Sequence, residues 1–382
     1  MVAVLYPQIV WAGPIESDIW GRIWNQGLLS PTLAKQRLLE ESRNYFQNTS
    51  TSNFKGPVLG FVTPWNGAGY DMARLFRHKF TYVTPCWYQL RRSRPDRRFV
   101  LAGQHDVDQS WMQDLRVPMH QGAVVPKIVP RVVFELGPQD TMDMLKSASR
   151  IALKIVRECS QQGFDGVVVE AWAGWQASGL LTGPHHDQAL AFMLGLSDAL
   201  HEAGLLLLMA VQPATSVKGA GHKPTLRATD WDALKSRVDA VTIMTYDAPS
   251  WGPTEFNAPL DWFQSNIEAL APKTELAGCN AFAHKALLGL NFYGWDYSAG
   301  QPPEAILGSR FREFLQLDTA DLRWDAAVAE HVLTYPHKGE MHRTFYPSLK
   351  SMHERLQTAA TSETGISIWE LGQGLEYFFD LL

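Results

Sequence analysis

The sequence predicts an α/β protein whose main domain is a (β/α)8 TIM barrel with a small α+β insertion after the seventh strand. Eight short apolar segments follow one another from Pro57 onward, and helical stretches separate them. Several of these segments are apolar on both faces, which is typical of parallel strands covered by helices. No GxGxxG or GxxxxGK motif follows the first segment. The signature that often accompanies a doubly wound open sheet, the alternative fold, is therefore missing.

The chain before Pro57 predicts a separate, partly helical arm over residues 1–56. A helical run opens at Ser30-Pro31 and continues through Leu38 to Tyr45, because proline is favoured in the first turn of a helix. The polar stretch 48–53 is then typical of a linker. We expect this arm to pack on the outside of the barrel domain, residues 57–382.

The eight strands are predicted as short apolar segments between turn or helix signals. They cover residues 58–62, 80–84, 127–134, 164–172, 205–211, 238–247, 286–293 and 366–371. Between the third and fourth strands, apolar residues recur at helical spacing over 142–159, and Gly163 ends this helix. A second helix is predicted over 187–204 and a last one over 349–360.

The interval between Tyr293 and Ile366 is too long for one crossover helix. Short strand-like segments flank the polar turn Lys338-Gly339-Glu340, and they predict a small insertion over about residues 298–347. Functional residues of a barrel lie at the carboxyl ends of its strands. An insertion after the seventh strand would therefore form one wall of the site.

Composition and charge narrow the classes of function. The 382 residues carry 34 basic and 39 acidic side chains, a net charge of −5, so nucleic acid is not an expected partner. The local basic cluster at residues 91–98 is interpreted as a solvated loop. No segment predicts a membrane span, and residues 1–11 lack the basic region of a signal peptide.

The sequence gives no sign of a metal site or a cofactor. Cys86, Cys159 and Cys279 are too few and too scattered for a disulfide framework or a zinc site, while a single disulfide stays open. The pairs His185-His186 and His105-Asp106 lack metal-site spacing and are interpreted as loop or helix-cap residues. We expect neither a metal nor a cofactor.

The predicted carboxyl ends of the strands combine aromatic, carboxylate and amide side chains. Indole rings stack on the apolar faces of sugars, while carboxylates and amides pair with sugar hydroxyls. For any single tryptophan, packing in the core is the simpler interpretation, but several at one rim favour a carbohydrate site. The candidate binding residues are Trp65, Trp87, Glu135, Glu170, Trp172, Tyr246, Asp247, Asn291, Tyr293, Trp369 and Glu370.

The segment from Asp165 to Trp172 carries the argument about catalysis. Alternation along a strand would place Val168, Glu170 and Trp172 on one face. The segment resembles the fourth strand of the chitinase-like glycoside hydrolases of family 18, whose pattern there is DGxDxDxE. Asp165 matches this pattern, Val168 and Glu170 stand where it has aspartates, and Trp172 stands where it has the catalytic glutamate. The resemblance implies that the proton donor of the family is missing.

Further motifs carry the resemblance. Met244-Thr245-Tyr246-Asp247 matches the MxYD motif of the family's sixth strand, and Trp369 matches the tryptophan of the eighth. In the family, the tyrosine and aspartate hold the acetamido group of the sugar, and the tryptophan forms the floor of the central subsite. Longer runs, among them 62–66, 105–109, 288–294 and 367–375, resemble the chitinase domain-containing or stabilin-interacting chitinase-like branch. That branch implies a stabilin-type scavenger receptor as partner and a secreted or lysosomal location.

We therefore expect a chitinase-like lectin that binds chitooligosaccharides or related amino-sugar glycans without hydrolysing them. Family 18 hydrolysis needs a protonatable acid beside the leaving oxygen. Glu170 is interpreted as a sugar-binding carboxylate, as a structural charge paired with Arg131 on the neighbouring strand, or as a displaced catalytic acid. The alternative functions are a hydrolase that uses this displaced acid and a protein-binding scaffold in secretory or lysosomal traffic. Restoring Val168→Asp, Glu170→Asp and Trp172→Glu together is predicted to create weak hydrolysis if the scaffold still positions an acetamido sugar.

Overall fold

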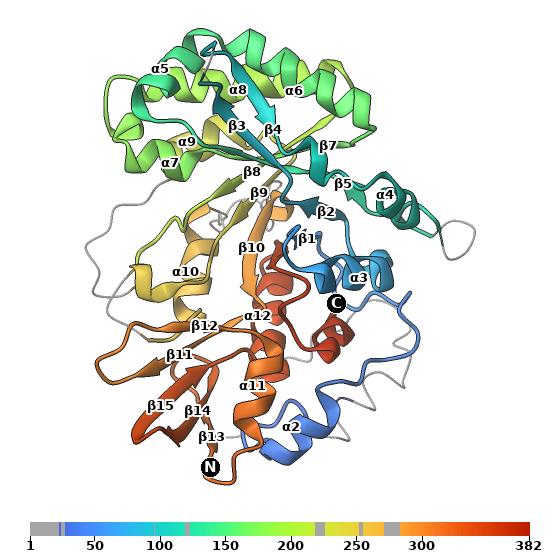
Figure 1. Ribbon diagram of the computed structural model, residues 1–382, viewed down its shortest axis with the longest axis vertical. Helices are drawn as coiled ribbons and strands as arrows, with labels where there is room; N and C mark the ends of the chain where they lie inside the picture. Colours follow the sequence, from blue (N-terminus) through green and yellow to red (C-terminus); the bar gives the residue numbers. More distant parts are fainter. Residues whose placement is uncertain are drawn as a thin grey trace, which may run out of the picture.

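A computed structural model of the chain describes residues 23, 27–94, 96–118, 123–217, 226–251, 255–270 and 283–382. Much of the predicted arm, including the segment 1–11, lies outside the described residues, as does Cys279. The structure is a barrel of parallel strands surrounded by helices, with a second sheet beside it (Figure 1).

Eight strand positions make up the barrel, and each segment predicted as a strand overlaps one of them. These segments are apolar because the barrel interior covers one face of each strand and helices cover the other. The strands are β1 (Val58–Val62), β2 (Tyr82–Pro85), β5 (Lys127–Ile128) continued by β6 (Arg131–Phe134), β7 (Gly166–Glu170), β8 (Leu206–Val211), β9 (Ala240–Ile243), β10 (Ala286–Asn291) and β16 (Gly365–Trp369).

The barrel closes through its third strand, which is interrupted at Val129 and Pro130. The first part of this strand, β5, pairs with β2, and the second part, β6, pairs with β7. Because the two parts are consecutive in the chain, the order β1, β2, β5/β6, β7, β8, β9, β10, β16 returns to β1. Neighbours along this ring are parallel. The carboxyl ends of the strands therefore meet at one rim.

A hairpin extends the second strand beyond the ring. β3 (Tyr88–Arg92) pairs in parallel with β6 and turns back as β4 (Phe99–Ala102). The interpretation of residues 91–98 as a loop is therefore wrong in part, because Arg91 and Arg92 lie in β3. Gly103, directly after β4, has a φ of 105°, and a Cβ there would lie 1.8 Å from the carbonyl oxygen of Trp87. Glycine alone fits this position.

Helices cover the outside of the ring. The helix predicted over 142–159 is two helices, because Ser147 between them has the non-helical angles φ −110° and ψ 23°. Gly163 ends the second of these with a φ of 75°, as predicted. The α-helices are α2 (Lys35–Glu41), α3 (Gly67–Leu75), α4 (Gln109–Leu115), α5 (Pro138–Lys146), α6 (Ala148–Gln162), α7 (Trp172–Ala177), α8 (His186–Glu202), α9 (Ala228–Leu234), α10 (Leu260–Leu270), α11 (Gly308–Leu315) and α12 (Leu349–Thr361).

Short 3₁₀ helices complete the connections: η1 (Arg77–Lys79), η2 (Gln104–Asp106), η3 (Leu180–Thr182), η4 (Ala248–Trp251), η5 (Ala283–Lys285) and η6 (Glu376–Leu381). Across the part of the chain that the structure describes, no helix combines the length and the apolar character needed to cross a membrane.

A second, antiparallel sheet lies between β10 and β16 in the chain. Its strands are ordered β12 (Glu304–Ile306), β11 (Gly294–Ser298), β15 (Glu340–Phe345), β14 (Glu330–His337) and β13 (Asp321–Asp325), and α11 connects β12 to β13. The predicted insertion, residues 298–347, falls in this part of the chain. In Figure 1 the sheet lies at the opposite end of the molecule from the β3–β4 hairpin.

Two layers of apolar side chains fill the fold, one inside the barrel and one between the strands and the helices. β7 supplies both layers: Val168 belongs to the interior cluster with Leu208, while Val167 and Val169 belong to the outer one. This split is the alternation expected for a strand. Side chains on the face of Val168 are thus directed along the barrel interior toward the rim.

Candidate functional site

Charged side chains from neighbouring strands meet at the rim of carboxyl ends. β7 ends at Glu170, two residues after the inward-facing Val168. Arg131 of β6 donates a hydrogen bond from Nη1 to Oε2 of Glu170 over 2.9 Å. Both side chains are largely buried, with 14% of Arg131 and 22% of Glu170 exposed. The pairing of Glu170 with Arg131 on the neighbouring strand is therefore confirmed.

Trp369, the last residue of β16, lies beside this ion pair. The guanidinium of Arg131 is 5.9 Å from the centre of the indole ring, a distance at which a cation is attracted to an aromatic face. The ring of Phe61 from β1 packs against the indole with centroids 5.3 Å apart. Trp369 is half-buried. Packing thus holds the indole in place while part of its surface stays accessible.

Asp247, which follows β9, is held by its neighbours. Its Oδ1 accepts hydrogen bonds from the hydroxyl of Tyr293 and, over 3.0 Å, from Nε1 of Trp295. Its backbone N–H donates to Oδ1 of Asn257 over 2.8 Å, which supports the left-handed φ of 60° at this residue. Aspartate adopts that conformation more readily than most residues. The carboxylate therefore has a defined position and direction.

A buried polar chain connects Asp247 to the second sheet and to α12. Glu330 in β14 accepts hydrogen bonds from the backbone N–H groups of Asn257 and Ala258, over 3.3 and 2.8 Å. Arg355 in α12 forms an ion pair with Glu330 over 3.3 Å. Burial raises the pKa of Glu330, and the positive charge of Arg355 opposes that shift. The position of Asp247 thus depends on elements outside the barrel strands.

Tyr246 and Asn291 are more deeply buried members of the same region. The rings of Tyr246 and Tyr293 meet edge to face with centroids 6.2 Å apart, and Asn291 donates from Nδ2 to the carbonyl oxygen of Tyr293 over 2.8 Å. Burial raises the pKa of both phenols well above the usual value. Both hydroxyls therefore stay protonated at neutral pH and act as hydrogen-bond donors.

These residues form one group, which we call the mouth cluster. Its parts are linked because Arg131 reaches both Glu170 and Trp369, and Trp369 packs with the tyrosines and Trp295. The mouth cluster consists of Arg131, Glu170, Tyr246, Asp247, Tyr293, Trp295 and Trp369.

Trp172 does not share the face of Glu170, so this prediction is wrong. β7 ends at Glu170, and Ala171 has a φ of −133° and a ψ of −31°, so the alternation of faces stops there. Trp172 begins α7 and packs in the outer core against Trp175, with ring centroids 6.0 Å apart. Its exposed fraction is 1%. As a sugar-binding residue Trp172 is therefore ruled out in this conformation.

Trp87 and Glu370 are also buried and are not available to a ligand. Nε1 of Trp87 donates to the hydroxyl of Tyr70 over 2.7 Å. Glu370 accepts hydrogen bonds from Nδ2 of Asn66 and, over 3.1 Å, from the backbone N–H of Gly372. Burial raises the pKa of Glu370, and these hydrogen bonds oppose the shift. Both predicted binding residues have structural partners instead.

The remaining candidates are exposed or lie at the other end of the barrel. Trp65 follows β1 and is 70% exposed, and Glu135 follows β6 and is exposed. Asp165 lies before β7, at the amino end of the barrel, where it pairs with Arg116 and Lys127 over 3.2 and 3.5 Å. Its role is to tie strands together at the end of the barrel opposite the rim.

Phe61 is missing from the residues predicted for the site, whereas Trp295 was expected at the carboxyl end of the seventh strand. Phe61 shares the inward face of β1 with Leu59, so alternation along the strand could have identified it. Trp295 lies two residues after Tyr293, and both donate to Asp247. The sequence contains no signal for that shared acceptor, because it depends on how β11 leaves the barrel.

The described residues offer no metal site and no reactive thiol at the mouth cluster. Among them, no three His, Cys, Asp or Glu side chains come together as metal ligands. Cys86 and Cys159 are both free and buried. Burial raises the pKa of each thiol to about 12, so neither is a thiolate nucleophile at neutral pH.

Comparisons with known proteins bear on this fold. A family model described as Glycosyl hydrolases family 18 matches residues 137–374. A chitinase from Chromobacterium violaceum ATCC 12472 is 20% identical with a TM-score of 0.68, over 85% of this chain and 98% of that one. The spore cortex-lytic enzyme SleL from Bacillus megaterium QM B1551 is 16% identical with a TM-score of 0.64, over 85% and 72%. A family 18 chitinase from Cycas revoluta, solved with allosamidin, is 15% identical with a TM-score of 0.62, over 85% and 97%. At these identities the likeness establishes the fold.

Proposed function

The chain belongs to glycosyl hydrolases family 18, and from this membership we propose that it is a chitinase-like lectin. It binds oligosaccharides of acetamido sugars, such as chitooligosaccharides, at the mouth cluster and does not hydrolyse them. The observation that carries the proposal is the absence of an available acid from the end of β7. By the family resemblance, Trp172 takes the place of the proton donor in the sequence, and Glu170 is engaged by Arg131.

Trp172 and Glu170 both argue against proton transfer. An indole cannot donate a proton to a leaving group at neutral pH, and the loss of a general acid costs about 10²–10⁴ in rate. Glu170 accepts from Arg131 over 2.9 Å. A protonated Glu170 would leave the largely buried Arg131 guanidinium without its anionic partner, which is energetically costly. Glu170 is therefore assigned as an acceptor.

The mouth cluster retains what sugar binding requires. Trp369 offers part of an indole face for stacking, and the phenols of Tyr246 and Tyr293 stay protonated as donors. A carboxylate has about four acceptor positions. Asp247 and Glu170 therefore keep acceptor capacity after bonding to their protein partners. By the family resemblance, Tyr246 and Asp247 receive the acetamido group and Trp369 supports the ring.

The resemblance to the stabilin-interacting branch supports two finer parts of the proposal. The chain binds a stabilin-type scavenger receptor, and it is secreted or lysosomal. Binding of the purified chain to the immobilised ectodomain of such a receptor tests the first part. Immunofluorescence against lysosomal and secretory markers, in cells that make the protein, tests the second. A diffuse cytoplasmic signal would contradict it.

Titration calorimetry and product analysis together test the lectin proposal. We expect the native chain to bind chitooligosaccharides with no sugar released across a wide pH range. Trp369→Ala should weaken binding by about 30-fold, the factor for a contact worth about 2 kcal/mol. Trp324→Ala is the matched control, because it removes another half-buried indole, in β13, which packs on His331 with ring centroids 4.8 Å apart.

Two outcomes would replace the lectin with an alternative function. Turnover by the native chain that disappears in Glu170→Gln would identify a hydrolase with a displaced acid. No heat with any member of a glycan panel, together with native behaviour of Trp369→Ala, would favour a protein-binding scaffold. Equal loss of affinity in Trp369→Ala and Trp324→Ala would remove the mouth cluster as the binding site.

A further inference from the structure

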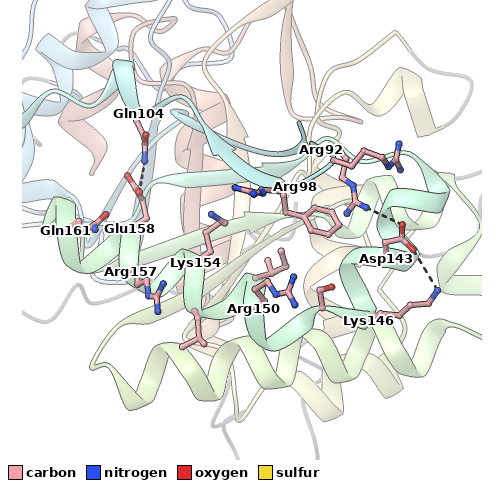
Figure 2. Close-up of a pocket in the computed structure, with 15 residues that line it drawn as sticks. Arg92, Arg98, Gln104, Asp143, Lys146, Arg150, Lys154, Arg157, Glu158 and Gln161 are labelled. Atoms are coloured by element: carbon pink, nitrogen blue, oxygen red, sulfur yellow. Dashed lines mark hydrogen bonds and ion pairs between the residues drawn. The ribbon is translucent and has the colours of Figure 1, made fainter. Parts of the chain in front are cut away.

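A basic groove lies on the outside of the barrel, between the β3–β4 hairpin and the helices α5 and α6 (Figure 2). Its volume is about 860 Å³, and no residue of the mouth cluster lines it. Seven of its lining side chains are lysine or arginine, while two are acidic. The chain as a whole has a net charge of −5. The positive charge of this groove is therefore a local concentration against a negative background.

Both acidic side chains of the groove already have protein partners. Glu158 is buried and accepts from the hydroxyl of Tyr88 over 2.8 Å. Asp143 pairs with Arg92 and Lys146 over 3.5 and 3.8 Å, as the dashed lines in Figure 2 show. Neither acid neutralises the cations along the rest of α6.

Arg150, Lys154 and Arg157 form a row on one side of α6. Their spacing of four and then three residues brings them to one helix face over about 10 Å. Within the described part of the chain, none of the three forms an ion pair with an acidic side chain, and Figure 2 shows them unlinked along the helix. Arg98 stands across the groove, from the hairpin, where it pairs with Asp96 over 3.2 Å. The groove thus offers a line of available cations rather than one point charge.

This arrangement favours an extended chain that carries repeated oxyanions. Arginine predominates among the cations, and its planar fork matches sulfate and carboxylate oxygens in pairs. Phe99, the aromatic side chain in the lining, is covered by the guanidinium of Arg92 at 4.3 Å. One face of this ring is therefore already occupied, which disfavours the stacking of unpaired nucleic acid bases here. Ile155 and Cys159 bury the main apolar face of α6 in the outer core. Leu153 is the exposed large apolar side chain that remains on this helix, and a single leucine is too small a surface to insert the helix into a membrane.

We propose that the groove between the β3–β4 hairpin and α6 binds a sulfated polysaccharide chain, at a site separate from the mouth cluster. Arg150, Lys154 and Arg157 contact successive sulfate groups, and the hairpin contributes Arg98 from the opposite side. The two sites are independent, so one molecule can hold a neutral amino-sugar glycan and a sulfated glycan together. This inference does not require the lectin proposal to be correct.

The test is titration of the native chain with heparin at several salt concentrations, beside the triple variant Arg150→Gln/Lys154→Gln/Arg157→Gln. Glutamine maintains helix propensity, so α6 should persist. Each cation near an anionic surface contributes a factor of about five at low salt, and the triple variant should therefore bind about a hundredfold more weakly. The slope of log affinity against log salt should fall by about two to three.

A matched control variant removes the same number of positive charges at positions outside the groove. The variant Arg43→Gln/Lys55→Gln/Lys338→Gln replaces three exposed cations outside the groove, and it should bind heparin like the native chain. An unchanged thermal midpoint and unchanged chitooligosaccharide binding of the groove variant confirm that its fold is intact. If neither chain binds chitooligosaccharide, the lectin proposal fails and the heparin comparison still stands.

Other polyanions decide whether the ligand class is right. Chemically desulfated heparin should bind far more weakly than heparin. Phosphatidylserine vesicles and single-stranded DNA should bind more weakly than heparin, with less dependence on the three cations. The proposal is overturned if desulfated heparin binds as tightly, if the control variant loses as much affinity as the groove variant, or if vesicles or DNA bind more tightly through the same residues.

Discussion

Replacing Trp172 by glutamate should destabilise the protein rather than restore catalysis. The sequence alone predicts weak hydrolysis from the triple restoration Val168→Asp, Glu170→Asp and Trp172→Glu, because it places Trp172 on the face of Glu170. In the structure Trp172 is 1% exposed and lies in the outer core beside Trp175. A glutamate at this position would therefore enter an apolar layer instead of the barrel interior.

The cost of this substitution follows from the buried area. A tryptophan side chain buries about 150–250 Å², which at about 25 cal/mol per Å² corresponds to about 4–6 kcal/mol. Trp172→Ala should accordingly cost about 4 kcal/mol, within the usual range for truncating a buried tryptophan. A buried carboxylate without a partner adds a further cost of about 1–3 kcal/mol or more. We expect Trp172→Glu to be the less stable of the two variants.

Thermal unfolding followed by circular dichroism measures this difference. The Trp172→Ala midpoint should fall by about 10 °C, at about 2–4 °C per kcal/mol. Trp172→Gln isolates the charge, since it has nearly the shape of glutamate. The difference between Glu and Gln should shrink as the pH is lowered, because a buried carboxyl is more readily protonated. Trp65→Ala, at a residue 70% exposed, should change stability by less than about 0.5 kcal/mol.

A native midpoint for Trp172→Glu would refute this reasoning. Hydrolysis of chitooligosaccharides by the triple restoration would refute it more directly, because it would require the new glutamate to reach the barrel interior. Trp172→Ala with a native midpoint would show that the outer core tolerates the loss of the indole. In that case burial in the outer core would not be what fixes the direction of the side chain at residue 172.

Three further predictions concern the ion pair, a buried histidine and a glycine. Glu170→Leu should lower the free energy of unfolding by about 3 kcal/mol, because it leaves Arg131 unpaired. Adding Arg131→Met in the same chain should recover most of this loss. If urea unfolding shows that the costs of the two substitutions simply add, the pairing is contradicted. Burial lowers the pKa of His331 from 6.5 to about 4, so the folded state favours neutral imidazole. Its stabilising contribution is complete above pH 6.5 and is lost as the pH falls toward 4, by about 2 kcal/mol at pH 5. In urea unfolding between pH 6.5 and 4, the free energy of unfolding of His331→Gln should fall less steeply with pH than that of the native chain. The same pH slope in both proteins would contradict this role of His331. Gly103→Ala should give little soluble protein, because its Cβ would lie 1.8 Å from the Trp87 carbonyl oxygen. Gly204 also has a left-handed φ, 72°, but nothing lies within 4 Å of the position of its Cβ, so Gly204→Ala should cost only about 1–2 kcal/mol in thermal unfolding. Equal soluble yields of Gly103→Ala and Gly204→Ala would show that the contact with the Trp87 carbonyl is not what requires glycine at residue 103.

The barrel was predictable because each strand is covered on both faces and therefore leaves an apolar segment in the sequence. The β3–β4 hairpin was not predictable. Arg91 and Arg92 lie in β3, but the basic composition around them is typical of a solvated loop. The break at Ser147 was missed for a related reason. Apolar residues continue at helical spacing on both sides of it, and only the backbone angles of Ser147 show that two helices meet there.

The contacts of the site between neighbouring strands could be predicted from the sequence. The directions of side chains just past the end of a strand could not. Arg131 and Glu170 lie on adjacent parallel strands, and their pairing could be proposed from the strand order. The side to which Trp172 points depends on where β7 stops. Ala171 leaves the extended conformation one residue before Trp172, and residue types alone do not show that turn.

The two carboxylates of the mouth cluster share one property that the proposed lectin function would use. Glu170 accepts from Arg131, and Asp247 accepts from Tyr293 and Trp295. A general acid must hold a proton in its resting state and direct it toward the leaving oxygen. Each of these two carboxylates instead has a protein donor directed at one of its oxygens. Such a carboxylate can still accept from a sugar hydroxyl through its remaining lone pairs, which is what a lectin requires of it.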